Sequence, residues 1–166
     1  MQFKLAAVMA LFAAASSVLA APLARRTISY TAPDQNASPG ELCAPGDINA
    51  YPQPYYPAGI TKCRRNVGTG LKDQIAAAYG IARSDYSSVE FDHLIPLGIG
   101  GDDSAANLWP QPLADAHVKD KVELAAFDQL SSGAIDQRAA VQMICDWLNT
   151  YYFNGQAVYS ASTYGL

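Results

Sequence analysis

The sequence of 166 residues is poor in basic side chains, with 11 lysines and arginines against 15 acidic residues and a formal net charge of −4. Proteins that follow a long phosphate backbone usually carry a basic face, so this balance argues against tight, extended binding to nucleic acid. It does not exclude a nuclease, because a bound cation or a short basic patch can supply positive charge locally. The candidate patch is Lys62, Arg64 and Arg65, for which a solvated edge is the plainer interpretation.

Cysteine is also scarce, and the three residues Cys43, Cys63 and Cys145 include no CxxC pair, so no zinc-finger pattern is present. In a secreted chain at least one disulfide bond is expected. A bond between Cys43 and Cys63 would close a Pro- and Tyr-rich loop, with a stabilisation on the order of 3 kcal/mol. Cys145 would then be a buried thiol on the apolar face of a helix, although its pairing with either of the other two stays open.

Long apolar runs are almost absent as well. The one exception is residues 1–20, a basic start followed by an apolar run that ends in a small residue, Ala20. This pattern is typical of a cleaved secretory signal peptide, and the run is too short to cross a bilayer comfortably. We therefore expect a secreted, extracellular protein without membrane contact.

After the signal peptide, Arg25-Arg26 is a candidate dibasic processing site that would end a propeptide over residues 21–26. An exposed basic pair explains it equally well. The length of the remaining chain, residues 27–166, suits a single domain with one core. We expect it to be a monomer.

Local patterns predict an α+β fold with an extended, Pro- and Tyr-rich N-terminal region. Composition indicates loop over residues 27–60, where Pro, Gly, Asn, Ser and Tyr dominate. Apolar spacing and end signals predict helices over residues 70–80, from after Pro112 to about Leu130, and from a cap at Asp136 to about Phe153.

The first of these helices is expected to bury Leu71, Ile75 and Ala78 along one side. A strand is expected over residues 86–91. The tail, residues 154–166, has no helical signal, so we expect it to pair as an edge strand or to lie loose.

The stretch from Glu90 to Glu123 concentrates the residues that carry chemistry. Asp92 and His93 are adjacent at the end of the expected strand, and a double-glycine turn, Asn107-Leu108 and a helix with His117 follow. The order of strand, turn, strand and helix predicts a ββα unit over about residues 87–131.

These elements resemble the HNH nucleases of the ββα-metal class. More narrowly, DHLIPLGIGGDDSAANLWPQP followed by HVKDKVE is similar to a group of small secreted bacterial and fungal HNH-like proteins, over about residues 90–123. The resemblance implies a metal-dependent endonuclease, a hydrolase that cleaves phosphodiester bonds of DNA or RNA. No added base-reading domain accompanies the motif, so little sequence preference is expected.

The candidate site follows from the motif. His93 is the candidate general base, because imidazole titrates near neutral pH. Asp92 and His117 are the candidate ligands of one divalent ion, such as Mg, Mn or Zn. Asn107 is either a third ligand or a catalytic amide that ties the loop to the strand and orients the base. Structural roles in a strand, a turn cap and a helix surface are the alternatives for His93, Asp92 and His117.

Two lysines on the same predicted helix, Lys119 and Lys121, are expected to be solvated. A different function is also compatible with the acidic charge and the Tyr-rich loop. In that alternative the chain is a secreted effector or interaction protein that keeps the scaffold with weak or no catalysis. A small extracellular metal-binding protein is a more remote third possibility.

Overall fold

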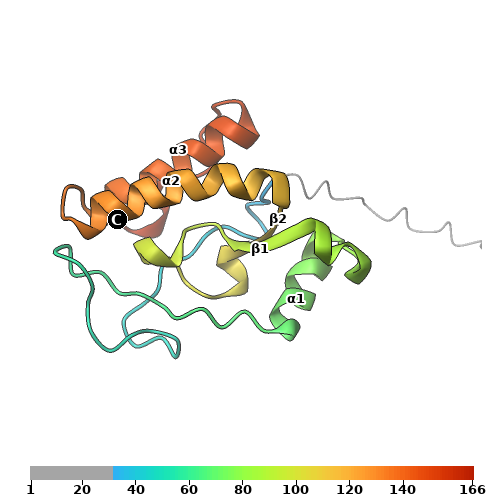
Figure 1. Cartoon of the computed structure of the whole chain (residues 1–166), viewed down its shortest axis with the longest axis horizontal. Helices are drawn as coiled ribbons and strands as arrows, with labels where there is room; N and C mark the ends of the chain where they lie inside the picture. Colours follow the sequence, from blue (N-terminus) through green and yellow to red (C-terminus); the bar gives the residue numbers. More distant parts are fainter. Residues whose placement is uncertain (1–31) are drawn as a thin grey trace, which may run out of the picture.

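The structure is a computed structural model that describes residues 32–166 (Figure 1). The predicted signal peptide and the dibasic site at Arg25-Arg26 lie outside these residues. Among the helices of the described part, none is long and apolar enough to cross a membrane.

A two-stranded antiparallel sheet lies between helices, which makes this a small α+β protein (Figure 1). Four short 3-10 helices, η1 to η4, occur in the connections of the described part. The strands and helices are β1 Val89–His93, β2 Leu108–Pro112, α1 Thr69–Tyr79, α2 Leu113–Ser131 and α3 Gln137–Phe153, and the 3-10 helices are η1 Arg83–Ser88, η2 Leu97–Ile99, η3 Ala105–Asn107 and η4 Ala161–Tyr164.

The β1-β2 hairpin followed directly by α2 forms the predicted ββα unit. In the register of the hairpin, Asp92 is paired with Trp109 and His93 with Leu108. Burial alternates along β1, so His93 is buried while the neighbouring Asp92 points to the other face and is only half-buried. The prolines in β2 are tolerated because the sheet has only edge strands.

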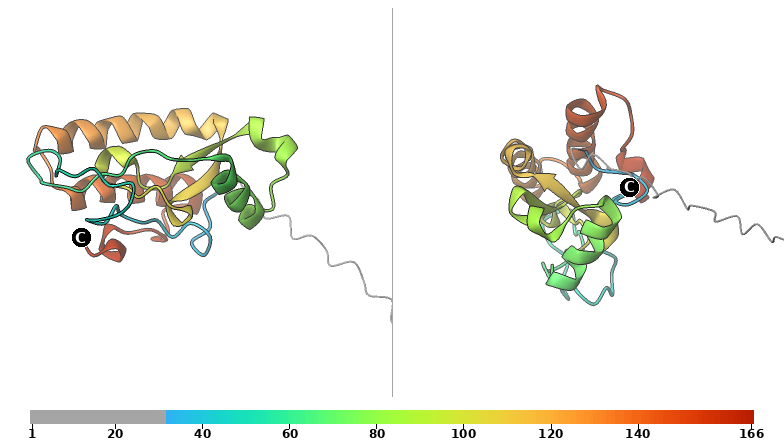
Figure 2. Two further views of the ribbon diagram at one scale, coloured as in Figure 1. Left: turned by 90° about the horizontal axis from the view of Figure 1, so that it is seen from below. Right: turned by 90° about the vertical axis from the view of Figure 1, so that its right-hand side faces the viewer.

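Helices α2 and α3 run side by side (Figures 1 and 2), and both reach the sheet, α2 through its contacts with β1 and β2 and α3 through the ring of Tyr152, which packs against Trp109 of β2. The predicted start of α3 is confirmed, because the Asp136 carboxylate accepts a hydrogen bond from the Ala139 N–H at 2.8 Å. Its inner face buries Ile144, Cys145 and Leu148 completely. Three helices were predicted from the sequence, and all three are present.

The disulfide prediction is also confirmed. Cys43 and Cys63 are bonded, and Cys145 is a buried free thiol on α3. The bond closes a loop over residues 43–63. We call residues 43–65 the arm, which follows an irregular course without helix, as composition predicted (teal in Figure 1).

Three details differ from the prediction. The strand expected over residues 86–91 begins later, because residues 86–88 belong to the 3-10 helix η1 and β1 is Val89–His93. In α1 the buried residues are Ile75, Ala76 and Tyr79, whereas Ala78 is exposed. The buried face of the helix is thus rotated by about one residue from the predicted face. The tail neither pairs as a strand nor lies loose, since Tyr159 is buried and the chain ends in η4.

The tail is held by the side chain of Asn149 on α3. Its amide nitrogen donates to the Tyr159 carbonyl at 2.7 Å, and its oxygen accepts from the N–H groups of Val158 and Tyr159, both at 2.9 Å. The hydrogen bonds of one buried side-chain amide thus hold the tail, in place of the backbone hydrogen bonds that an edge strand would make.

Candidate functional site

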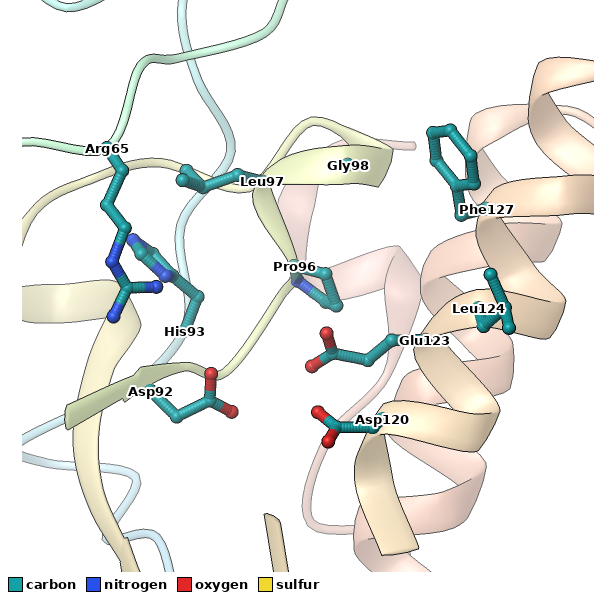
Figure 3. Close-up of a pocket in the computed structure, with 10 residues that line it drawn as sticks. All are labelled: Arg65, Asp92, His93, Pro96, Leu97, Gly98, Asp120, Glu123, Leu124 and Phe127. Carbon is teal, nitrogen blue, oxygen red and sulfur yellow. The ribbon is translucent and has the colours of Figure 1, made fainter. Parts of the chain in front are cut away.

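A pocket of about 350 Å³ opens between the end of β1, the loop that follows it and α2 (Figure 3). Its polar lining combines a guanidinium, an imidazole and several carboxylates. The lining residues are Arg65, Asp92, His93, Pro96, Leu97, Gly98, Asp120, Glu123, Leu124 and Phe127.

His93 is the imidazole of this pocket. It is 3% exposed, and its Nε2 lies 2.8 Å from Oδ1 of Asp103. Burial lowers the pKa of His93 below its usual 6.5, and the hydrogen bond to Asp103 opposes this only in part. The neutral imidazole donates Nε2–H to the carboxylate, which accepts only. Nδ1, which has no hydrogen-bond partner in the described part of the chain, then carries the lone pair of a base.

Asp103 was not singled out from the sequence, which predicted only a turn at this point. The Asp103 side chain is fully buried, and its second carboxylate oxygen accepts a hydrogen bond from the backbone N–H of Asn66 at 2.5 Å. Asp103 therefore links the imidazole to Asn66, directly after the arm, and fixes the orientation of the ring. The signal that was available is an acidic pair directly after the double glycine, inside the motif.

Lys119 corrects another expectation, since it is 1% exposed instead of solvated. Its ammonium donates to Asp92 at 2.6 Å, to the carbonyl of His93 at 2.6 Å and to Glu123 at 2.5 Å. Burial alone would lower the pKa of Lys119, but the two carboxylates outweigh it and raise the pKa, so the ammonium stays charged. Lys119 thereby anchors the end of β1 to α2.

The inward face of α2 explains this burial. Ala116, Lys119 and Ala126 are all buried and follow helical spacing, so the lysine occupies a position that an apolar residue would normally take. Glu123 lies four residues after Lys119, a spacing that places both on the same face.

His117 lies on the opposite face of α2. Its side chain is 85% exposed, and its Nδ1 is 3.8 Å from a carboxylate oxygen of Asp120. Two residues along a helix correspond to a rotation of about 200°, so His117 points away while Lys119 points inward. The structure does not bring His117 to Asp92, and His117 does not line the pocket.

Asn107 is fully buried, and its amide is engaged in the loop. The nitrogen donates to the carbonyls of Ile95 at 2.9 Å and Asp102 at 2.7 Å, and the oxygen accepts from the N–H groups of Ile95 at 2.9 Å and Glu41 at 3.4 Å. These bonds use every donor and acceptor of the amide. Of the two roles considered for Asn107, the contacts match the one that ties the loop.

The double glycine is required at the same place. A Cβ on Gly101 would lie 1.8 Å from the carbonyl oxygen of Ile95, and Gly100 has a φ of +96°, which a side chain rarely adopts. The close approach of the loop lets Asn107 bridge Ile95 and Asp102, and it places Asp103 beneath His93.

The three ligands predicted for a metal ion are therefore not assembled, because only Asp92 lines the pocket. Within residues 32–166, the ligand atoms of Cys43, Cys63 and Asp102 are the one group of its kind within 4.8 Å of one another. Two of these residues form the disulfide, so this group is not clearly a metal site. At the pocket itself, the oxygen donors are the carboxylates of Asp92, Asp120 and Glu123, which face the same space (Figure 3).

Arg65 completes the polar lining and was noted in the sequence only as part of a basic patch. Its guanidinium lies beside the His93 ring (Figure 3), and it donates to the carbonyl of Phe91 at 3.2 Å. Arg65 ends the arm two residues after Cys63, so the end of the arm brings a positive charge to the pocket.

Comparisons with protein-family models, curated proteins and solved structures find no match to this chain. The fold and site define an α+β protein in which a β-hairpin and a following helix frame a polar pocket. Its resemblance to the HNH class rests on the residues of the motif.

Proposed function

We propose that this protein is a secreted endonuclease of the HNH type, which hydrolyses phosphodiester bonds of DNA or RNA with little sequence preference. One observation supports this most strongly: a buried His93, kept neutral by desolvation and oriented by Asp103, lies in one pocket with Arg65. The Cys43–Cys63 disulfide fits the oxidising compartments through which secreted proteins pass.

In the proposed reaction the Nδ1 of His93 takes a proton from a water molecule as its oxygen attacks phosphorus. The bond from phosphorus to the leaving sugar oxygen breaks, and that oxygen takes up a proton from solvent water. Arg65 binds the nonbridging phosphate oxygens, because a guanidinium can donate two parallel hydrogen bonds to them. Lys119 positions Asp92 and holds the strand end against α2.

The charge balance of the pocket supports the predicted divalent cation. Asp92, Asp120 and Glu123 bring three carboxylates, whereas Arg65 and the buried Lys119 bring two positive charges. Carboxylate oxygen is the donor that magnesium and calcium prefer, so these acids, and not His117 or Asn107, would supply the ligands. In the structure their oxygens do not all lie within 4.8 Å of one another, and Lys119 bonds to two of the three acids. When bound, such an ion would offset the charge of the phosphate and stabilise the leaving oxygen.

Incubation of the purified protein with supercoiled plasmid and with a structured RNA tests this function. Each substrate is exposed to protein with EDTA alone and with magnesium, manganese or zinc restored after EDTA treatment. We expect cleavage that EDTA removes and a divalent ion restores. Cleavage that continues in EDTA would remove the cation from the proposal but keep the hydrolase.

The alternative function is a secreted interaction protein without catalysis. The observation in its favour is that Lys119 already bonds to Asp92 and Glu123, which satisfies two of the pocket carboxylates from within the chain. Absence of cleavage of both substrates under every metal condition would place this alternative first.

A further inference from the structure

A row of aromatic rings leads from the arm to the pocket. Tyr51 and Tyr55 have ring centroids 5.3 Å apart, Tyr55 and Tyr56 5.9 Å, and Tyr56 and Phe127 5.8 Å. We call these four residues the aromatic row. Phe127 lines the pocket that contains His93, so the row ends where the proposed chemistry takes place.

Positive charges accompany the aromatic row. The ammonium of Lys62 lies 4.8 Å from the ring centroid of Tyr55 and 5.1 Å from that of Tyr56, and the guanidinium carbon of Arg64 lies 4.6 Å from that of Tyr51. No ion pair within residues 32–166 involves Lys62 or Arg64. Their charges are thus not neutralised by a carboxylate of the described chain, although the protein as a whole is acidic.

The row is held in place by the backbone of the arm. Tyr56 has a φ of +61°, an uncommon conformation for a bulky residue, and its hydroxyl accepts a hydrogen bond from Lys62 at 2.8 Å. The disulfide and the backbone pairing of Tyr55 with Ile60 restrain the same loop. The three tyrosines remain half-buried.

Tyr51, at the outer end of the row, packs against the ring of Tyr55 and the guanidinium of Arg64. Within the described chain its hydroxyl makes no hydrogen bond, and the core cluster includes Tyr55 and Tyr56 at its edge but not Tyr51. A hollow of about 560 Å³ lies beside Tyr51, between Pro52, Pro54 and Thr61.

We infer that the aromatic row with Lys62, Arg64 and Arg65 is a platform for single-stranded nucleic acid, which it leads into the His93 pocket. Unpaired bases stack on aromatic side chains whatever their identity, and the basic groups contact the phosphates between them. Bases within a duplex are already stacked on one another and cannot use such a row. The inference rests on the proposed function, and it narrows the substrate to DNA or RNA with unpaired bases.

Fluorescence anisotropy of the full secreted chain carrying His93→Ala tests the platform, since binding is then measured without cleavage. The probes are labelled oligothymidine and oligouridine strands and a duplex of the same length. We expect at least tenfold tighter binding of the single strands. Tyr51→Ala should weaken single-strand binding roughly fivefold to hundredfold, and Tyr51→Phe, which keeps the ring, should restore it.

Arg64→Gln provides a second variant at an exposed position. It should weaken binding of both single strands and lower the slope of log affinity against log salt by about 1, as expected for the loss of one phosphate contact. Thermal unfolding of each variant, with the disulfide verified by peptide mapping, separates a lost contact from a lost fold.

The outcomes distinguish this inference from the proposed function. Equal affinity for duplex and single strands, or an unchanged affinity in Tyr51→Ala, overturns the platform even if the wild-type protein cleaves plasmid. Tyr51-dependent binding of single strands by a protein that cleaves nothing would instead overturn the nuclease and keep the platform.

Discussion

The two histidines of this chain occupy opposite environments. His93 is buried at the end of β1, 2.8 Å from the carboxylate of Asp103, whereas His117 is exposed on α2 with its nearest carboxylate oxygen at 3.8 Å. Both lie inside the same motif, and both were candidates for the same site. Their difference shows that the order of motif residues identifies a unit, while the phase of each side chain on its strand or helix decides which of them meet.

Replacing each histidine in turn tests this difference most strongly. His93→Ala should lower the rate of phosphodiester cleavage by roughly two to four orders of magnitude, because the general base is lost. His117→Ala, the matched control on the outer face of α2, should keep the rate within about twofold, since surface changes away from a site are usually neutral. Single-turnover cleavage of a labelled substrate measures both. Equal losses in the two variants would place His117 at the site after all.

The two lysines of α2 sharpen the same contrast between inner and outer faces. Lys119→Met leaves the half-buried carboxylates of Asp92 and Glu123 without their cation, which should lower the free energy of unfolding by up to about 3 kcal/mol. Lys121→Met, on an exposed position of the same helix, should change it by less than about 0.5 kcal/mol. Urea unfolding followed by circular dichroism measures both. Similar stability of the two variants would show that Lys119 is solvated in solution.

The lowered pKa of His93 predicts a smaller effect, which depends on pH. The unfolded chain takes up a proton at His93 near pH 6.5, whereas the folded chain takes it up only at a lower pH. Stability should therefore fall as the pH drops below 6.5, until the folded form is protonated too.

Urea unfolding at several pH values between 7.5 and 4.5 measures this loss, and His93→Asn serves as the control without a titrating ring. As the pH falls, the free energy of unfolding should decrease more for the wild type than for His93→Asn. A difference that is constant over this range would mean that folding does not alter the pKa of His93.

Sequence patterns predicted those parts of the molecule that depend on local spacing. The three helices, the ββα order and the disulfide follow from periodicity, turn residues and loop closure. The burial of Lys119 could not be read from its own helix alone, because it depends on Asp92 from β1 as well as on Glu123. In the same way Asp103 gains its role only when the loop folds back beneath His93, and Asn149 only when the tail returns to α3.

The site was predicted in part for the same reason. Asp92 and His93 line the pocket as expected, since both belong to the strand end that the motif marks. Arg65 enters from the arm, which is distant in sequence, and a basic pattern in a loop does not say which cavity it faces. His117 was placed by its position in the motif, without regard to the helical phase that turns it outward.

The central claim is that His93 is a neutral base whose Nε2–H is held by Asp103 and whose Nδ1 is free. Two-dimensional NMR of the imidazole nitrogens over a pH titration measures both properties, and the His117→Asn variant assigns the signals. The account predicts that His93 carries its proton on Nε2 and titrates below pH 6.5. A proton on Nδ1, or titration at or above pH 6.5, would contradict it.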